Sequence, residues 1–143
     1  MIGKFIEPAK LEKLWSHVED LFRKTQKHAT GYYSMEDLVT GIVNGTMQCG
    51  LVADPETGEF KALVVTQRTA TPQRMILRVM GLAGDEFDEI MKLENELDNL
   101  AREMECDEIS AVTRPGMAKK LKEYGWEQVG ILMRKDIKQE RVH

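Results

Sequence analysis

The sequence predicts an α/β fold in which a mixed, mostly antiparallel central sheet is flanked by helices. Apolar residues have helical spacing near the start of the chain and again over residues 85–104, whereas short β-rich runs occupy the middle. Asp-Pro and Thr-Gly dipeptides within residues 54–59 predict a hairpin turn between two of these runs. The 143 residues are 42% hydrophobic, which is enough to close one core, so we expect a single domain over residues 1–143.

Two helices are predicted first. Apolar residues recur every three or four positions from about Pro8 to Lys27, and this stripe is expected to pack in the core rather than bind a ligand. A second helix is expected to begin at Ser34, with Asp37 as its capping partner, and to end at Asn44 and Gly45. The stripe of the first helix consists of Leu11, Leu14, Trp15, Val18, Leu21 and Phe22.

The rest of the chain completes the order α-α-β-β-β-α-β-α-β. Strands are predicted where β-branched and apolar residues are concentrated, and helices where the spacing returns to three and four. A left-handed Gly125 is expected to end the last helix. The predicted strands are 46–53, 60–67, 74–81, 108–113 and 129–137, and the predicted helices are 85–104 and 115–125.

Charge and composition exclude several classes of protein. Residues 85–108 contain two Lys or Arg against eleven Asp or Glu, and residues 109–143 contain eight against four, so no clustered basic groove for nucleic acid is expected. No apolar run approaches the roughly 18 residues that span a membrane, and the first residues do not resemble a signal peptide. Cys49 and Cys106 lack metal-ligand spacing, so neither a metal site nor a disulfide framework is expected, and either cysteine is expected to be a small buried hydrophobe.

The order of elements, together with two local motifs, resembles the GNAT N-acetyltransferase superfamily. The stretch "RVMGLAG" matches the Arg/Gln-x-x-Gly-x-Gly/Ala pattern of that family at Arg78, Gly81 and Ala83, and "MAKKLKEYGWE" is similar to the helix before its final strand. The resemblance covers nearly the whole chain. It implies that Arg78, Gly81, Ala83 and the adjoining Gly84 form a loop that holds the pyrophosphate of acetyl-CoA at the start of a helix, if coenzyme A is bound.

Two departures from the family pattern favour a protein without catalysis. Asp85, Glu86, Asp88 and Glu89 follow the motif and would repel a polyanion, although Asp85 could equally be the N-cap of its helix, with the others complementing the helix dipole. The family's tyrosine acid corresponds to Leu121. No catalytic residue, metal or cofactor is therefore expected. None of the three histidines (His17, His28 and His143) has a visible nucleophile or carboxylate partner in the sequence.

A narrower resemblance is to GNAT-like morphogenesis proteins of tailed phages. It rests on the Gly-x-Met-Gln stretch at Gly45, Cys106-Asp107, the Arg114-x-Gly116 turn and the Gly-aromatic-Glu at Gly125. It implies a virion structural or assembly protein that acts through contacts with other virion proteins, in the host cytoplasm during assembly, with incorporation into the virion left open. The alternative is an acetyl-CoA-dependent N-acetyltransferase, and whether the chain is an enzyme stays open.

The acidic segment supplies a candidate contact surface for such a virion protein. Glu89, Glu96 and Glu103 recur at seven-residue intervals of the predicted helix over residues 85–104 and would fall along one side of it. Such a face is usually only solvated. The competing hypothesis is that it meets a basic patch on another virion subunit, for which complementary charge would set orientation and association rate.

Overall fold

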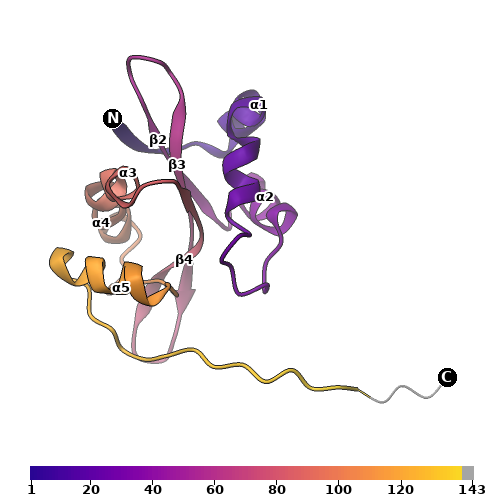
Figure 1. Ribbon diagram of the computed structural model, residues 1–143, viewed down its shortest axis with the longest axis vertical. Helices are drawn as coiled ribbons and strands as arrows, with labels where there is room; N and C mark the ends of the chain where they lie inside the picture. Colours follow the sequence, from indigo (N-terminus) through magenta and orange to yellow (C-terminus); the bar gives the residue numbers. More distant parts are fainter. Residues whose placement is uncertain (140–143) are drawn as a thin grey trace. The chain divides into compact units, whose positions relative to one another are not determined.

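A computed structural model describes residues 1–139 of the chain (Figure 1). Residues 1–111 form one compact unit, and the residues from Val112 onward form a second. The first unit contains the sheet and the helices packed on its two faces, and the second contains one short helix and an extended segment. The expectation of one domain over residues 1–143 stays a prediction.

The first unit is built on a five-stranded sheet whose strands follow one another in chain order, β1-β2-β3-β4-β5. Neighbouring strands are antiparallel, except that β4 and β5 are parallel, so the predicted mixed and mostly antiparallel sheet is confirmed. The first strand was missed in the sequence, because only six residues separate Met1 from the first helix. The strands are β1 (Ile2–Ile6), β2 (Gln48–Ala53), β3 (Phe60–Ala70), β4 (Met75–Gly84) and β5 (Glu108–Ser110).

Helices cover both faces of this sheet (Figure 1). The helices α1 (Pro8–Lys24) and α2 (Met35–Val43) pack on one face, and α4 (Glu94–Glu103) packs on the other. The central strand β3 serves both layers, because successive side chains of a strand point to opposite faces. Leu63 and Val65 belong to the core on the side of α1, whereas Ala62 and Val64 belong to the core on the side of α4.

The first two helices form for the reasons that the sequence indicates. Pro8 occupies the first turn of α1, where its missing N–H costs no hydrogen bond. The apolar stripe is in the core, and the rings of Trp15 and Phe22 lie 5.3 Å apart, so the prediction of a packing helix is confirmed. Ser34 and Asp37 form a reciprocal capping box at the start of α2, with N···O distances of 2.8 and 3.1 Å.

The predicted long helix over residues 85–104 is wrong in its continuity. The structure divides it into α3 (Phe87–Ile90), the 3₁₀ turn η1 (Met91–Leu93) and α4. Leu93 is buried against the sheet, and Gly3 of β1 approaches the carbonyl of Lys92 so closely that a Cβ at Gly3 would lie 2.7 Å from its oxygen. Packing of η1 against β1, a strand absent from the sequence prediction, therefore accompanies the break.

The hairpin turn between β2 and β3 is confirmed. The Asp54 carboxylate accepts a hydrogen bond from the N–H of Glu56 at 2.9 Å, and the Asp54 N–H donates to the carbonyl of Glu59 at 2.8 Å. Gly58 has φ of +74°, a backbone conformation that residues with side chains rarely adopt. The turn fixes the register of the two central strands.

The second unit contains α5 (Pro115–Leu121), followed by the 3₁₀ turn η2 (Lys122–Tyr124). The predicted left-handed end of this helix is confirmed, because Gly125 has φ of +87° and the N–H of Trp126 donates to the carbonyl of Leu121 at 3.2 Å. The strand predicted over residues 129–137 is wrong: the segment is not in a sheet, and its apolar side chains are exposed.

Candidate functional site

The structure places all four residues of the predicted coenzyme A loop inside strand β4. Arg78, Gly81, Ala83 and Gly84 lie within Met75–Gly84, so the loop implied by the family resemblance is wrong, whereas the strand predicted over residues 74–81 is confirmed and extends to Gly84. The helix that follows, α3, has only four residues, and its dipole is correspondingly small. Any ligand at this motif would therefore meet a strand edge rather than the end of a long helix.

Strand β4 has a bulge in the middle of the motif. Val65 of β3 pairs with Gly81, but the next residue of β3, Thr66, pairs with Val79, so Met80 is an extra residue on β4. The hydroxyl of Thr66 is buried and donates to the side-chain oxygen of Gln48 at 3.0 Å. A bulge changes the direction of a strand and the aim of its backbone groups, which is why bulges are common beside active sites.

The bulge comes where β4 loses its second partner. Strand β5 pairs with β4 only at Ile76, Leu77 and Arg78. Among the residues that the structure describes, no strand pairs with the opposite edge of β4 from Val79 to Gly84. Because backbone N–H and C=O groups of a strand point alternately to its two sides, half of the groups in this stretch face away from β3. This six-residue edge of β4, residues 79–84, is the candidate binding surface and is called the open edge below.

The two glycines of the motif are explained by packing on the two faces of the sheet. A Cβ at Gly81 would lie 2.9 Å from the side chain of Leu38 on α2, and a Cβ at Gly84 would lie 2.7 Å from the side chain of Ile90 on α3. Ala83 is buried in the core beside α1 and α2. Bulky substitutions at these positions would therefore disturb the core, whether or not a ligand binds the open edge.

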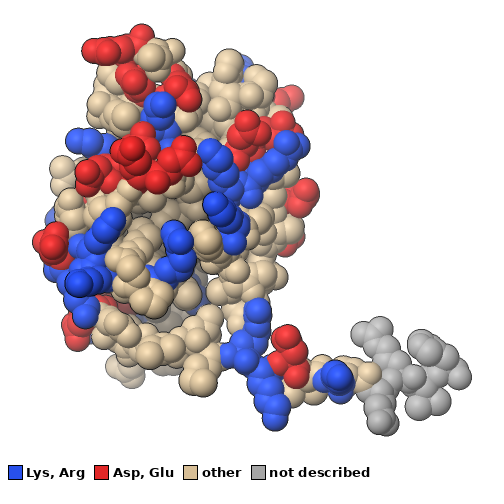
Figure 2. Space-filling view, viewed as in Figure 1, with Lys and Arg blue, Asp and Glu red and all other residues tan. Residues whose placement is uncertain are grey.

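The charges beyond the open edge are mixed. Asp85 and Glu86 are exposed, and Glu86 rather than the predicted Asp85 is the N-cap of α3, without a side-chain capping bond. Figure 2 shows acidic side chains over the region of α3. The Lys24 ammonium, at the end of α1, lies 3.5 Å from an oxygen of Asp85 and partly offsets this charge. No pattern in the sequence links Lys24 to Asp85, because 61 residues separate them.

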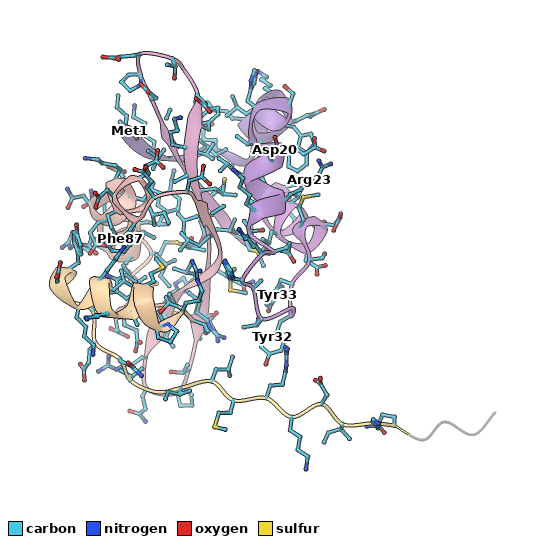
Figure 3. The ribbon with its side chains drawn as sticks, viewed as in Figure 1. Met1, Asp20, Arg23, Tyr32, Tyr33 and Phe87 are labelled. Carbon is cyan, nitrogen blue, oxygen red and sulfur yellow. The ribbon has the colours of Figure 1, made fainter. Side chains whose placement is uncertain are left out.

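The position of the family's tyrosine acid is occupied by Leu121, and the tyrosines lie elsewhere in the chain. Leu121, which stands in place of the tyrosine acid, is a buried residue of α5. Tyr32 and Tyr33 lie exposed on the loop between α1 and α2, on the opposite side of the sheet from Phe87 of α3 (Figure 3). His17 and His28 are exposed, and His143 lies outside the described residues. No pattern in the sequence singles out the two tyrosines.

The described residues hold no cluster of three or more candidate metal ligands, and one of their two cysteines is buried. Within residues 1–139, no group of three or more His, Cys, Asp or Glu side chains is arranged to hold a metal ion. Cys49 is buried, and burial raises its pKa to about 12, which keeps the thiol protonated and unreactive near neutral pH. The described part of the chain has no helix long and apolar enough to cross a membrane.

Known structures share this fold at low sequence identity. A probable acetyltransferase superposes with a TM-score of 0.71 at 11% identity over 99% of both chains. The glucosamine-6-phosphate N-acetyltransferase from Arabidopsis thaliana has a TM-score of 0.64 at 13% identity over 96% of this chain and 100% of the other. A predicted acetyltransferase with acetyl-CoA from Clostridium acetobutylicum has a TM-score of 0.65 at 11% identity over 94% of each.

These likenesses establish that the chain has a GNAT-like fold, and the family resemblance of the sequence is confirmed at that level. No protein-family model matches the chain, and no curated protein matches it either. The narrower resemblance to phage morphogenesis proteins receives no support from the similar structures.

Proposed function

We propose that this chain binds acetyl-CoA along the open edge of β4 and transfers the acetyl group to an amine. The single observation that carries the proposal is the bulged strand β4, which loses its partner β5 after Arg78 and leaves six residues with one edge unpaired. Structures with the same fold include acetyltransferases, and one of them is described with acetyl-CoA. The acceptor amine stays unspecified.

The open edge suits the pantetheine arm of coenzyme A. That arm is an extended chain with two amide groups, and an extended chain can add to a sheet edge by main-chain hydrogen bonds. In the open edge, the backbone groups of alternate residues face away from β3 and are available for these bonds, while the Cβ positions of Gly81 and Gly84 face packed side chains. Arg78, which is exposed just before the bulge, is a candidate for contact with the acyl end or the acceptor.

The chain's contribution to catalysis is positioning. When bound, acetyl-CoA supplies an acetyl group activated as a thioester. An amine nitrogen held beside the bulge attacks the thioester carbonyl carbon, the carbon–sulfur bond breaks, and the proton of the amine leaves to solvent while the thiolate takes one up. Backbone N–H groups at the bulge would stabilise the charge that develops on the carbonyl oxygen. Because Leu121 replaces the family's acid, no side chain is assigned to protonate the thiolate.

The acids beyond the edge limit the affinity. Asp85 and Glu86 oppose the pyrophosphate, and Lys24 offsets one of them. We therefore expect a dissociation constant at the weak end of the range usual for enzyme substrates, about 1 mM.

Calorimetric titration with acetyl-CoA tests the proposal. We expect saturable binding, and weaker binding of 3′,5′-adenosine bisphosphate, which carries phosphates but lacks the pantetheine arm. Consumption of the thioester in the presence of a panel of primary amines then tests transfer. Absence of binding at concentrations about tenfold above 1 mM, or equal binding of the nucleotide without the arm, would refute the role of the open edge.

A second candidate is a scaffold without catalysis in the assembly of a phage particle, acting on other virion proteins. It is favoured by Leu121 in place of the acid and by the acids next to the open edge. Glu96 and Glu103 lie on α4, whereas Glu89 lies on α3 before the η1 turn, so the predicted single helix face is divided between two elements. Reversing the three acids to Lys still tests a charged contact in this region, because surface changes usually cost within about 0.5 kcal/mol each. Loss of the triple variant from particles supports the scaffold, and incorporation at the wild-type copy number contradicts this contact face.

A further inference from the structure

Three polar side chains form a row across the sheet where the open edge begins. Arg78 of β4 pairs with Gln67 of β3 on one side and with Ser110 of β5 on the other. Directly opposed residues of neighbouring strands point to the same face of a sheet, at the strand spacing of about 4.8 Å. An amide, a guanidinium and a hydroxyl therefore lie side by side on one face. These three residues, Gln67, Arg78 and Ser110, are called the polar row below.

The polar row is on the face of the sheet that carries α1 and α2. Leu77 is buried in the core on the side of α4, so the next side chain, that of Arg78, points to the opposite face. Arg78 is exposed there, and Gln67 and Ser110 are half-buried, so the helices of this face leave the row accessible. All three residues belong to the first unit, residues 1–111.

The donors of the polar row are unused within the described part of the chain. No hydrogen bond or ion pair joins the guanidinium of Arg78 to another described residue, and the side chains of Gln67 and Ser110 form none either. Glu108, two residues before Ser110 on β5, points to the same face. Its carboxylate is already engaged, because an oxygen lies 3.2 Å from a guanidinium nitrogen of Arg74. The row therefore presents several N–H and O–H donors without an acceptor.

Such a row fits an anion. A guanidinium binds a carboxylate or a phosphate through two parallel N–H···O bonds, and an amide and a hydroxyl beside it can donate further bonds. From this geometry we infer that the acceptor of the acetyl group is a compact amine that also carries a carboxylate or a phosphate, and that the polar row holds this anionic group. The inference rests on the proposed function, because an acetyl donor on the open edge is what makes the neighbouring molecule an acceptor.

The polar row places the amine of such an acceptor at the bulge. Met80 lies two residues beyond Arg78, roughly 7 Å along the strand. An anion held by Arg78 and an amine a few bonds away span this distance, which brings the nitrogen beside the acyl end of the pantetheine arm. Asp85 and Glu86, which repel anions, follow the other end of the open edge. Arg78 is thus a specificity residue, which sets the amine that binds and transfers no proton.

Titration of the full chain followed by amide NMR shifts tests the row without turnover, with and without coenzyme A. We expect 4-aminobutanoate and O-phosphoethanolamine to shift the amides of the polar row saturably, and butylamine and ethanolamine, the matched amines without the anion, to leave them unshifted. The binding should weaken as salt is raised from about 0.05 M to about 0.5 M, because the charges are screened. The tighter of the two anionic amines decides between carboxylate and phosphate. Equal shifts by amines with and without the anion, or no shift by any of them, overturn the inference.

Arg78→Gln supplies the variant for turnover, because it removes the charge and the fork from an exposed side chain. The preference for 4-aminobutanoate over butylamine, as a ratio of kcat/KM values, should fall about tenfold or more, and Arg78→Lys, which keeps the charge without the fork, should restore only part of it. Arg102→Gln removes the same charge from α4, on the other face of the sheet, and is the control that should keep the wild-type ratio. Circular dichroism checks that each variant is folded.

The outcomes separate this inference from the proposed function. A wild-type preference in Arg78→Gln, or no preference in the wild type, overturns the inference while acetyl-CoA binding and transfer stand. Absence of acetyl-CoA binding by the wild type refutes the proposed function, and with it the assignment of the anionic amine as an acceptor, even where the amine shifts the polar row.

Discussion

At the scale of single residues, the clearest consequence of burial is the chemistry of Cys49. Its side chain is fully buried in the core beneath α1 and α2, and burial raises its pKa from 9.0 to about 12 because the thiolate would lose its hydration. Cys106 is only partly buried and lies in the other core. The two free cysteines should therefore differ in reactivity.

The raised pKa of Cys49 predicts a loss of stability at alkaline pH. Between pH 9 and pH 12 the unfolded chain releases the Cys49 proton and the folded chain keeps it, so the free energy of unfolding falls as pH rises. The slope from this group approaches about 1.4 kcal/mol per pH unit. Denaturation of the wild type and of Cys49→Ala between pH 8 and about pH 11 should show the extra slope only in the wild type. Parallel pH profiles would contradict the assignment.

Replacing Gly125 with valine should have a conformational cost but no steric cost. A Cβ at Gly125 has no atom within 4 Å, so the cost of Gly125→Val comes from its φ of +87°. We expect the variant to destabilise the second unit by about 1–3 kcal/mol. Gly116→Val is the matched control, because Gly116 has equal space and no positive φ. Chemical denaturation followed by Trp126 fluorescence measures both, and equal midpoints would contradict the left-handed helix end.

Substitutions that remove the charge of Lys24 and of Asp85 should have opposite effects on the binding of an anionic ligand. The Lys24 ammonium is the cation beside the exit of the open edge, and Asp85 is the acid it contacts. Lys24→Ala should weaken acetyl-CoA binding by about two- to fivefold, and Asp85→Asn should strengthen it by a similar factor. Lys10→Ala, at the other end of α1, is the control and should have no effect. Calorimetry decides, and changes of the same sign in both variants would contradict this placement of the phosphates.

At the scale of elements, the capping box of α2 gives a direct stability test. Ser34→Ala removes the hydroxyl that accepts from the Asp37 N–H and should cost about 1 kcal/mol. Ser16→Ala, on the exposed side of the middle of α1, should be neutral or slightly stabilising, because alanine has the higher helix propensity. Thermal unfolding of both variants provides the comparison. A Ser34→Ala variant as stable as the wild type would show that the cap contributes nothing.

Elements with local signals could be predicted, and elements that depend on distant contacts could not. The capping pair of α2, the stripe of α1 and the Asp54–Gly58 turn are encoded within a few residues and are confirmed. The strand β1 pairs with β2 more than forty residues away. The break at η1 accompanies packing on that same strand. The segment 129–137 has a strand pattern but is in no strand of the described residues.

The candidate site was only partly predictable for the same reason. The motif from Arg78 to Gly84 contains the open edge, yet it lies in a strand rather than a loop. Its glycines are required by Leu38 and Ile90, which approach from α2 and α3. The bulge at Met80 exists only as a register difference between β3 and β4, and the Lys24–Asp85 pair joins residues that are 61 positions apart in the chain. A pattern of residue types contains none of these relations.

At the scale of the whole molecule, residues 1–111 form a three-layered unit. In its sheet, β4 and β5 pair only at Ile76, Leu77 and Arg78. The same fold occurs in known structures that are 10–15% identical to this chain, acetyltransferases among them. Most of the fold is therefore specified by packing patterns that tolerate wide substitution. The function that we propose depends instead on the edge of one strand and the few charges beside it.

Hydrogen exchange of the open edge with and without saturating acetyl-CoA tests this account most directly. We predict that amides of residues 79–84 that do not bond to β3 exchange about tenfold or more slowly with the ligand. The amides of β1, which is also an edge strand, serve as the internal control and should be unchanged. Unaltered exchange at residues 79–84 under saturation, or equal slowing in β1, would contradict the assignment of the open edge as the coenzyme A site.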